Sequence, residues 1–166
     1  FNESFATAVE HEGVRRWFVS NGTAFQQAVL SSRQEREAVF IDLVLRHRKQ
    51  LQEMFRSDIS DVEKRTQKAH IFEELHKEFL RQKADKAEFS SYDQWFAQPL
   101  NNALLATVSI YTQLLPAFQA ILVQHDKDME RFFDAITKIS RLPKKERNLV
   151  LQKAVEGNQE WMIVER

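Results

Sequence analysis

Apolar residues recur at three- and four-residue steps along most of the chain, which is the periodicity of helices that bury one face. One such stripe consists of Val39, Phe40, Leu43, Val44, Leu51, Met54 and Phe55. A second stripe consists of Val62, Ala69, Phe72, Leu75, Phe79 and Leu80. No stretch of useful length alternates apolar and polar residues as a half-buried strand would. The pattern therefore predicts an all-α fold, a helical bundle.

Start and stop signals divide the first third of the chain. The first helix is expected from about Asn2 to Val19, followed by a left-handed stop at Gly22. Two capping-box patterns come next, Thr23 with Gln26 and Ser32 with Glu35. Residues up to about Arg56 therefore form either one long helix or two stacked helices.

A third capping box, Ser60 with Glu63, opens a helix that runs to about Ala87. Only the turn at 57–60 separates it from the preceding helix, and two long helices joined by so short a loop lie antiparallel. We therefore predict a projecting helical hairpin between Arg33 and Lys86. Its many charged residues fit a solvated face better than a docking surface.

The second half of the chain predicts several shorter helices. An aromatic segment at 92–96 precedes an uncharged helix at about 101–125, which Pro116 is expected to kink. An amphipathic helix at 129–139 follows, and a last one begins near Pro143 and ends at Gly157. We expect a single domain over 1–166 with three parts: the first helix and the start of the next at 1–32, the hairpin at 33–87 and the core helices at 88–166.

The uncharged segment raises the question of a membrane span. No Asp, Glu, Lys or Arg occurs from Gln94 to Gln124, and Ala103 to Val123 is long enough to cross a bilayer. The polar residues within it, among them Thr107, Ser109, Thr112 and Gln113, fit a helix buried in a soluble core better than one facing lipid.

Charge and composition narrow the functional classes. Lysine plus arginine equals aspartate plus glutamate at 24 each, so no basic excess favours nucleic acid as a partner. The absence of cysteine excludes disulfides and thiolate metal sites. The chain begins with Phe1 and shows no signal-peptide pattern, so we expect any targeting segment to lie outside it, in a longer protein.

The opening segment FNESFATAVE is the most specific motif in the chain. It is similar to the N-E-x-F-A helix of gluzincin-type zinc peptidases, which brings a glutamate ligand to the metal. Further stretches resemble a bacterial family of predicted aminopeptidases often carried as lipoproteins. These stretches are V-E-x-x-G-x-x-R-W at 9–17, the segment at 92–96, LNNALLATVSIY at 100–111 and residues 116–118.

The resemblance implies that Glu3 is a zinc ligand. An H-E-x-x-H helix supplies the other ligands in such enzymes, and His11-Glu12 does not match that pattern. The two metal-binding histidines and the catalytic glutamate are therefore expected upstream of Phe1. We expect this chain alone to be inactive and to bind no zinc tightly. By spacing alone, Glu3 is better explained as an ordinary acid in the first turn of a helix, where the helix dipole favours it, and only the resemblance favours the ligand.

Four other residues are candidates for contacts with a peptide substrate. Glu10 lies two turns beyond Glu3, too far to share one ion with it, and is either a contact for a substrate amine or a surface acid. The resemblance implies that Tyr111 stabilises the oxyanion of the scissile carbonyl group. It also implies that Asn101 and Asn102 bind the backbone of the peptide substrate. Burial of these three on the uncharged helix would explain them equally well.

The remaining histidines are poor metal ligands. His70 and His76 are six residues apart and point to different sides of a helix. His47 and His76 could meet across the hairpin, where a structural role is the simpler interpretation.

The sequence thus predicts the C-terminal, gluzincin-like part of a zinc-dependent aminopeptidase that hydrolyses peptides with a metal-activated water. The alternatives are a helical interaction module without activity and a relative that has lost its zinc. A periplasmic location with a lipid anchor outside this chain is implied by the resemblance alone.

Overall fold

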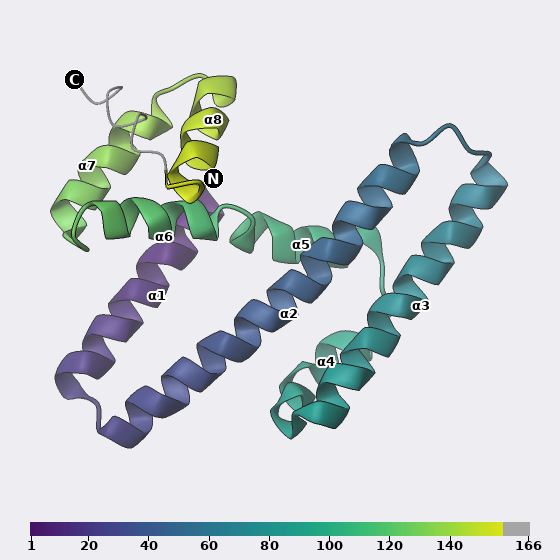
Figure 1. Ribbon diagram of the computed structural model, residues 1–166, viewed down its shortest axis with the longest axis horizontal. Helices are drawn as coiled ribbons and strands as arrows, with labels where there is room; N and C mark the ends of the chain where they lie inside the picture. Colours follow the sequence, from purple (N-terminus) through teal and green to yellow (C-terminus); the bar gives the residue numbers. More distant parts are fainter. Residues whose placement is uncertain (158–166) are drawn as a thin grey trace. The chain divides into compact units, whose positions relative to one another are not determined.

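The computed structural model describes residues 1–157, and all regular elements of that part are helices, as predicted. Figure 1 shows their arrangement. In order they are α1 (Asn2–Asn21), α2 (Ala24–Arg56), α3 (Asp61–Asp85), the 3-10 helix η1 (Ala87–Tyr92), α4 (Asp93–Phe96), α5 (Asn102–Thr112), α6 (Leu115–Gln124), α7 (Met129–Ser140) and α8 (Lys144–Val155).

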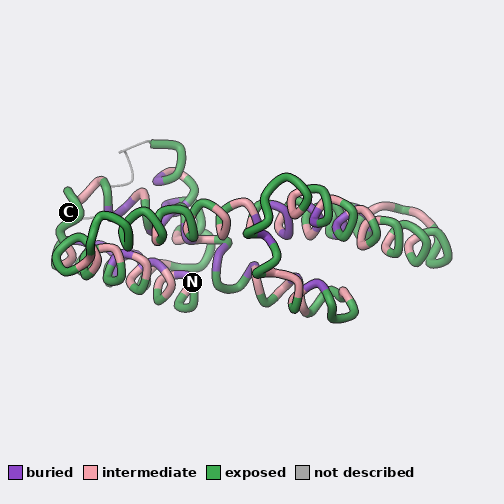
Figure 2. The backbone as a smooth tube through the Cα atoms, turned by 90° about the horizontal axis from the view of Figure 1, so that it is seen from below, coloured by how far each residue is buried: buried purple, intermediate pink, exposed green. Residues whose placement is uncertain are grey.

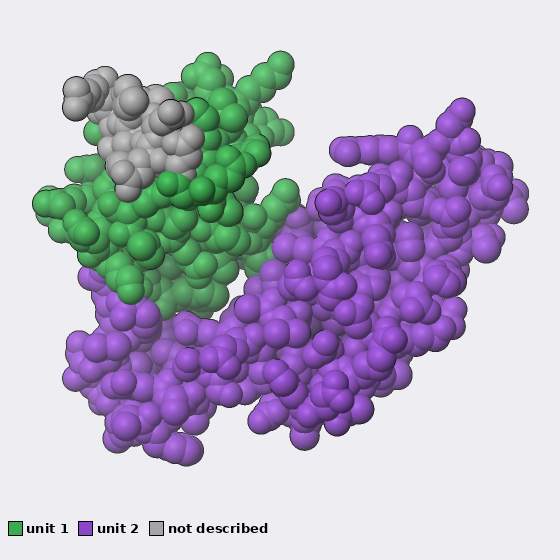
Figure 3. Space-filling model, in the orientation of Figure 1, with its two compact units in different colours: residues 1–13, 111–166 green, residues 14–110 purple. Residues whose placement is uncertain are grey.

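The chain divides into two compact units (Figure 3). Unit 2 is the continuous stretch 14–110, and unit 1 combines residues 1–13 with the chain from 111 onward. Each unit has its own cluster of buried apolar residues. The expectation of a single domain stays a prediction, because two compact units can still belong to one domain.

Unit 2 is built on the helical hairpin of α2 and α3, which pack side by side and antiparallel (Figure 1). Both predicted capping boxes that start these helices are present, at Thr23 with Gln26 and at Ser60 with Glu63. The Ser32 pattern starts no helix, because α2 continues through it. The buried apolar cluster of this unit consists of Phe40, Leu43, Val44, Leu51, Met54, Leu75, Phe79, Phe96 and Leu105.

A polar cluster crosses the middle of the hairpin. The guanidinium of Arg46 donates to the carboxylate of Glu78 at 2.8 Å and to Asp42 at 2.8 Å. His47 is buried, and its Nδ1 lies 2.9 Å from the backbone oxygen of Leu43. His76 is exposed, and its ring lies near those of Phe79 on the same helix and Phe96 on α4, so no histidine pair is buried between α2 and α3.

Aromatic stacking holds the segment after α3 against the hairpin. Phe40 stacks on Tyr92 with ring centroids 4.1 Å apart, and Phe79 stacks on Phe96 at 3.8 Å. The ammonium of Lys83 contacts the carboxylate of Asp93 at 2.7 Å. The aromatic segment predicted at 92–96 therefore closes the open end of the hairpin.

The expected left-handed stop at Gly22 is wrong, because its φ is not positive. Glycine fits there for a different reason: a Cβ at this position would lie 2.6 Å from the backbone oxygen of Phe18. The left-handed residues in the described chain are Asp126, Lys127 and Gly157. Gly157 follows α8, where a glycine stop was expected.

The uncharged segment forms two helices instead of one kinked helix. The break falls at residues 113–114, and Pro116 lies in the first turn of α6, where its missing N–H costs little. By length and hydropathy, Asn102–Gln124 is the one segment of the described chain that could cross a bilayer. Its 18-residue window is 39% buried inside the structure, and Ser109 and Thr112 are among its buried residues.

Unit 1 packs α6 against both α7 and α8 and adds the first turns of α1. Figure 2 shows how buried positions recur along the individual helices. On α7 they are Phe132, Ala135, Ile136 and Ile139, which is the spacing of one helix face. The amphipathic helix predicted at 129–139 is therefore present.

Candidate functional site

An aromatic cluster positions the start of α1. The ring of Phe1 packs edge-on against Phe118 with centroids 5.1 Å apart, and Phe5 contacts both Phe118 and Phe132 at 5.7 and 5.9 Å. Phe118 and Phe132 are fully buried. The cluster therefore fixes the orientation of the helix turn that carries Glu3.

Glu3 and Glu10 lie on the exposed face of α1. The buried residues of this helix are Ser4, Ala8 and Glu12, which lie on its opposite side. No hydrogen bond or ion pair joins the Glu3 carboxylate to another residue of the described chain. The carboxylate is therefore free to bind a ligand from outside.

The described chain contains no group of three or more histidine, aspartate or glutamate side chains that could hold a metal ion. Within residues 1–157, Glu3 is thus a single carboxylate, and a structural or catalytic zinc site needs three or four protein ligands. Any site that includes Glu3 must take its other ligands from elsewhere.

Tyr111 ends up exposed, near the C-terminal end of α5. Its side chain is 46% exposed, whereas the neighbouring Thr112 is buried and anchors this turn. No described residue makes a hydrogen bond with its hydroxyl group. The burial explanation for Tyr111 is therefore wrong, and its hydroxyl group is available to a ligand.

Asn101 and Asn102 are exposed as well, which removes the burial explanation for both. The Oδ1 of Asn101 accepts the backbone N–H of Leu104 at 3.0 Å, and its Nδ2 donates to the backbone oxygen of Pro99 at 3.0 Å. Asn101 therefore acts as the N-terminal cap of α5, a role that needs no substrate.

The five predicted site residues fall in different units. Glu3, Glu10 and Tyr111 belong to unit 1, and Asn101 and Asn102 belong to unit 2. The structure supports three of them as exposed polar groups on one unit, and it gives Asn101 a structural role.

Comparison with known families adds an independent observation. A family model described as "Putative aminopeptidase" matches residues 1–151, which covers almost all of the described structure. The chain belongs to this family. The match includes Glu3, Glu10 and Tyr111, so all three lie within the part that the aminopeptidase family shares. No curated protein and no solved structure matches the chain significantly.

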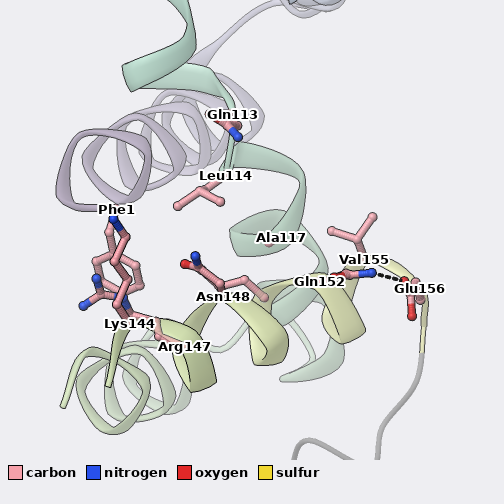
Figure 4. A pocket seen from close by; sticks show the side chains of 11 residues that line it. Phe1, Gln113, Leu114, Ala117, Lys144, Arg147, Asn148, Gln152, Val155 and Glu156 are labelled. Atoms are coloured by element: carbon pink, nitrogen blue, oxygen red, sulfur yellow. Dashed lines mark hydrogen bonds between the residues drawn. The ribbon is translucent and has the colours of Figure 1, made fainter. Parts of the chain in front are cut away.

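Sequence reasoning missed one feature of unit 1, a cavity between α6 and α8 (Figure 4). Its side chains come from the start of the chain, from 113–117 and from 144–156, and no local motif predicts that these segments meet. The run of basic residues at the start of α8 was the only local signal.

Proposed function

We propose that this chain is part of a zinc-dependent aminopeptidase and that Glu3 is one of the ligands of the zinc ion. The single observation that carries the proposal is the family match, which spans the N-E-x-F-A segment. An aminopeptidase of the gluzincin type needs a glutamate ligand on a helix, and the exposure of Glu3 in the first turn of α1 supports this role.

The donor chemistry fits zinc. A carboxylate is a suitable anionic ligand for zinc beside two imidazoles. The Glu3 carboxylate lies in the first turn of α1 and forms no hydrogen bond or ion pair with another described residue that would compete with the metal. The two histidines and the catalytic glutamate would come from a segment outside this chain. When bound, the zinc ion would supply a polarised water molecule for hydrolysis.

Tyr111 would donate a hydrogen bond to the oxygen of the scissile carbonyl as negative charge develops there. Its exposed hydroxyl group supports this role, because a phenol already hydrogen-bonded inside the protein could not provide it. Glu10 would bind the amino group of the substrate, about 10 Å from Glu3 along the helix axis. Asn101 already caps α5 and belongs with Asn102 to unit 2, so we assign neither of them a substrate contact.

Two other functions remain as competitors. A helical interaction module without activity would leave Glu3 as an ordinary first-turn acid, and a degenerate peptidase would keep the scaffold without the metal. The family match favours the enzyme, and metal content separates the three.

The test uses the protein together with its upstream sequence. We expect about one zinc per chain, and we expect Glu3→Gln to lower zinc affinity about 100-fold or more, because loss even of a residue that hydrogen-bonds to a ligand costs about 10- to 100-fold. Glu10→Gln is the matched control and should keep the zinc. Zinc content measured by mass spectrometry checks both variants, and an unchanged content in Glu3→Gln would refute the ligand assignment.

Tyr111→Phe tests the oxyanion role separately. We expect kcat on a peptide substrate to fall about 100- to 1000-fold while the zinc content stays the same. A variant with full activity would remove Tyr111 from the proposal and leave Glu3 untouched.

The chain by itself should bind no zinc tightly, because it offers one carboxylate where a four-coordinate site is needed. One stoichiometric zinc that resists a chelator, found in the 166-residue chain, would contradict this expectation.

A further inference from the structure

Unit 1 contains a cavity of about 640 Å³ that lies along α8. This volume is within the range of about 300–1,000 Å³ typical of ligand pockets. Figure 4 shows that the side chains lining it come from α8 on one side and from the start of α6 on the other. The cavity has two charged ends that differ in sign.

One end is cationic. Lys144 and Arg147 line it, and the guanidinium of Arg147 lies over the ring of Phe1, 4.8 Å from the ring centre. No carboxylate among residues 1–157 forms an ion pair with either side chain. This end of the cavity therefore carries two positive charges that favour an anionic group of a ligand.

The other end is anionic. Glu156 lines it, and its Oε1 accepts a hydrogen bond from the Nε2 of Gln152 at 2.9 Å. One hydrogen bond leaves most of the acceptor capacity of a carboxylate unused. Glu156 follows Arg147 by about two and a half helical turns, which places their backbones about 13–14 Å apart along the helix.

The floor between the two ends is apolar with amide groups beside it. Leu114 and Val155 supply accessible apolar surface, and the lining also includes the buried Ala117 and Leu151. Asn148 projects between the two ends in Figure 4 and makes no hydrogen bond to another described residue. A side-chain amide of this kind can donate to and accept from a peptide backbone at once.

We propose that this cavity binds short free peptides of three or four residues. The peptide carboxylate would lie between Lys144 and Arg147, and the peptide amino group would lie at Glu156. An extended chain spans about 3.3–3.6 Å per residue, so four residues match the separation of the Arg147 and Glu156 backbones along the helix. Apolar side chains of the peptide would cover Leu114 and Val155.

Other ligand classes fit less well. A fatty acid would satisfy the cationic end and leave Glu156 facing a hydrocarbon chain, which is unfavourable for a charge. An inorganic anion would leave the apolar floor uncovered. The free peptide is the class whose amine, carboxylate and apolar side chains each have a matching group in the cavity.

The first experiment titrates the ¹⁵N-labelled chain with the peptide Ala-Leu-Leu-Ala and follows the amide signals by NMR. We expect saturable shifts at residues lining the cavity, such as Asn148 and Leu151. Acetylating the peptide amine or amidating its carboxylate should each raise Kd about tenfold, because each removes one charge-assisted contact. Equal binding of the free and capped peptides would overturn the proposal. Stronger binding of decanoate than of the free peptide would also overturn it and would identify a fatty-acid site.

Variants test which end of the cavity binds the peptide carboxylate and which end binds the peptide amino group. Lys144→Gln and Arg147→Gln should each weaken binding of the free peptide about tenfold and remove its advantage over the amidated form. Glu156→Gln should remove the advantage over the acetylated form. Lys145→Gln is the matched control, because Lys145 is exposed on the same helix and does not line the cavity.

Circular dichroism of each variant shows whether the fold is kept. Arg147→Gln removes the contact of the guanidinium with the Phe1 ring and could unfold the chain for that reason. In that case Lys144→Gln still tests the cationic end of the cavity. Weakening by Lys145→Gln equal to that by Lys144→Gln would show non-specific charge attraction and would overturn the proposal. The zinc content of the proposed metal site is not affected by these variants, so the failure of either proposal can be distinguished from that of the other.

Discussion

The surroundings of two glycines in this chain differ: packing leaves room for a side chain at one of them and excludes a side chain at the other. Gly13 lies inside α1 on its exposed side, and a Cβ added there would meet no atom within 4 Å. Gly22 lies just after α1, where a Cβ would lie 2.6 Å from the oxygen of Phe18 and 2.9 Å from its ring. Packing within the described chain thus requires glycine at position 22 and not at position 13.

Replacing each glycine by alanine tests this contrast. Gly13→Ala should stabilise the chain by about 0.5–1 kcal/mol, because glycine inside a helix costs about that much relative to alanine. Gly22→Ala should destabilise it, because a backbone oxygen cannot move aside as the end of a flexible side chain can. The free energy of unfolding from urea denaturation measures both changes, and changes of the same sign would contradict the explanation.

At the scale of single elements, α2 and α3 show which signals in a sequence are reliable. The capping boxes at Thr23 and Ser60 form because the chain before each of them leaves the helical conformation. Ser32 and Glu35 carry the same pattern, yet their backbone stays helical because the neighbouring residues continue the helix. A local motif marks a possible helix start, and the chain on either side of it decides whether the helix begins there.

The hairpin also contains an ion pair whose strength depends on pH. The hydrogen bond from Arg46 lowers the pKa of Glu78 below its ordinary value of 4.5. The folded state therefore gains stability from this carboxylate above the ordinary pKa, and the gain is lost as the pH falls through the lowered pKa.

Glu78→Gln should destabilise the chain by about 0.2–1 kcal/mol at pH 7, because the pair is partly exposed. The difference from the unmodified chain should shrink once the pH drops below the ordinary pKa of 4.5. Glu53→Gln is the control, since its contact with Lys49 is 4.0 Å long and both side chains are well exposed. Thermal unfolding at several pH values measures the effect, and a constant difference between pH 7 and pH 3 would argue against it.

The candidate site was only partly predictable, and the reason is physical. The motif around Glu3 predicted a zinc ligand, which stays a prediction, and the structure leaves that carboxylate exposed. The sequence could not show that Asn101 caps a helix, because that depends on where the helix starts. It could not reveal the cavity along α8 either, because Phe1 and Arg147 meet only in the folded chain.

At the scale of the molecule, each unit has a separate apolar core. Phe118 is fully buried in unit 1 and contacts Phe1 and Phe5, whereas Leu75 is fully buried in unit 2. The two residues lie in different clusters, so a cavity at one removes contacts from that cluster alone.

Phe118→Ala should destabilise unit 1 by about 3–5 kcal/mol, and Leu75→Ala should destabilise unit 2 by about 2–5 kcal/mol. Hydrogen exchange should show lost protection in α6 and α7 for the first variant and in α2 and α3 for the second. Equal loss of protection over the whole chain in both variants would instead indicate one cooperative unit.

The path of the chain through the two units has a consequence for biosynthesis. Unit 2 is complete once residue 110 has left the ribosome, whereas the first turns of α1 contact Phe118 and Phe132, which are made later. During translation Phe1 and Phe5 therefore remain without their partners while the hairpin can already form. The nascent protein exposes the aromatic face of α1 during this interval, which is the kind of surface that chaperones recognise.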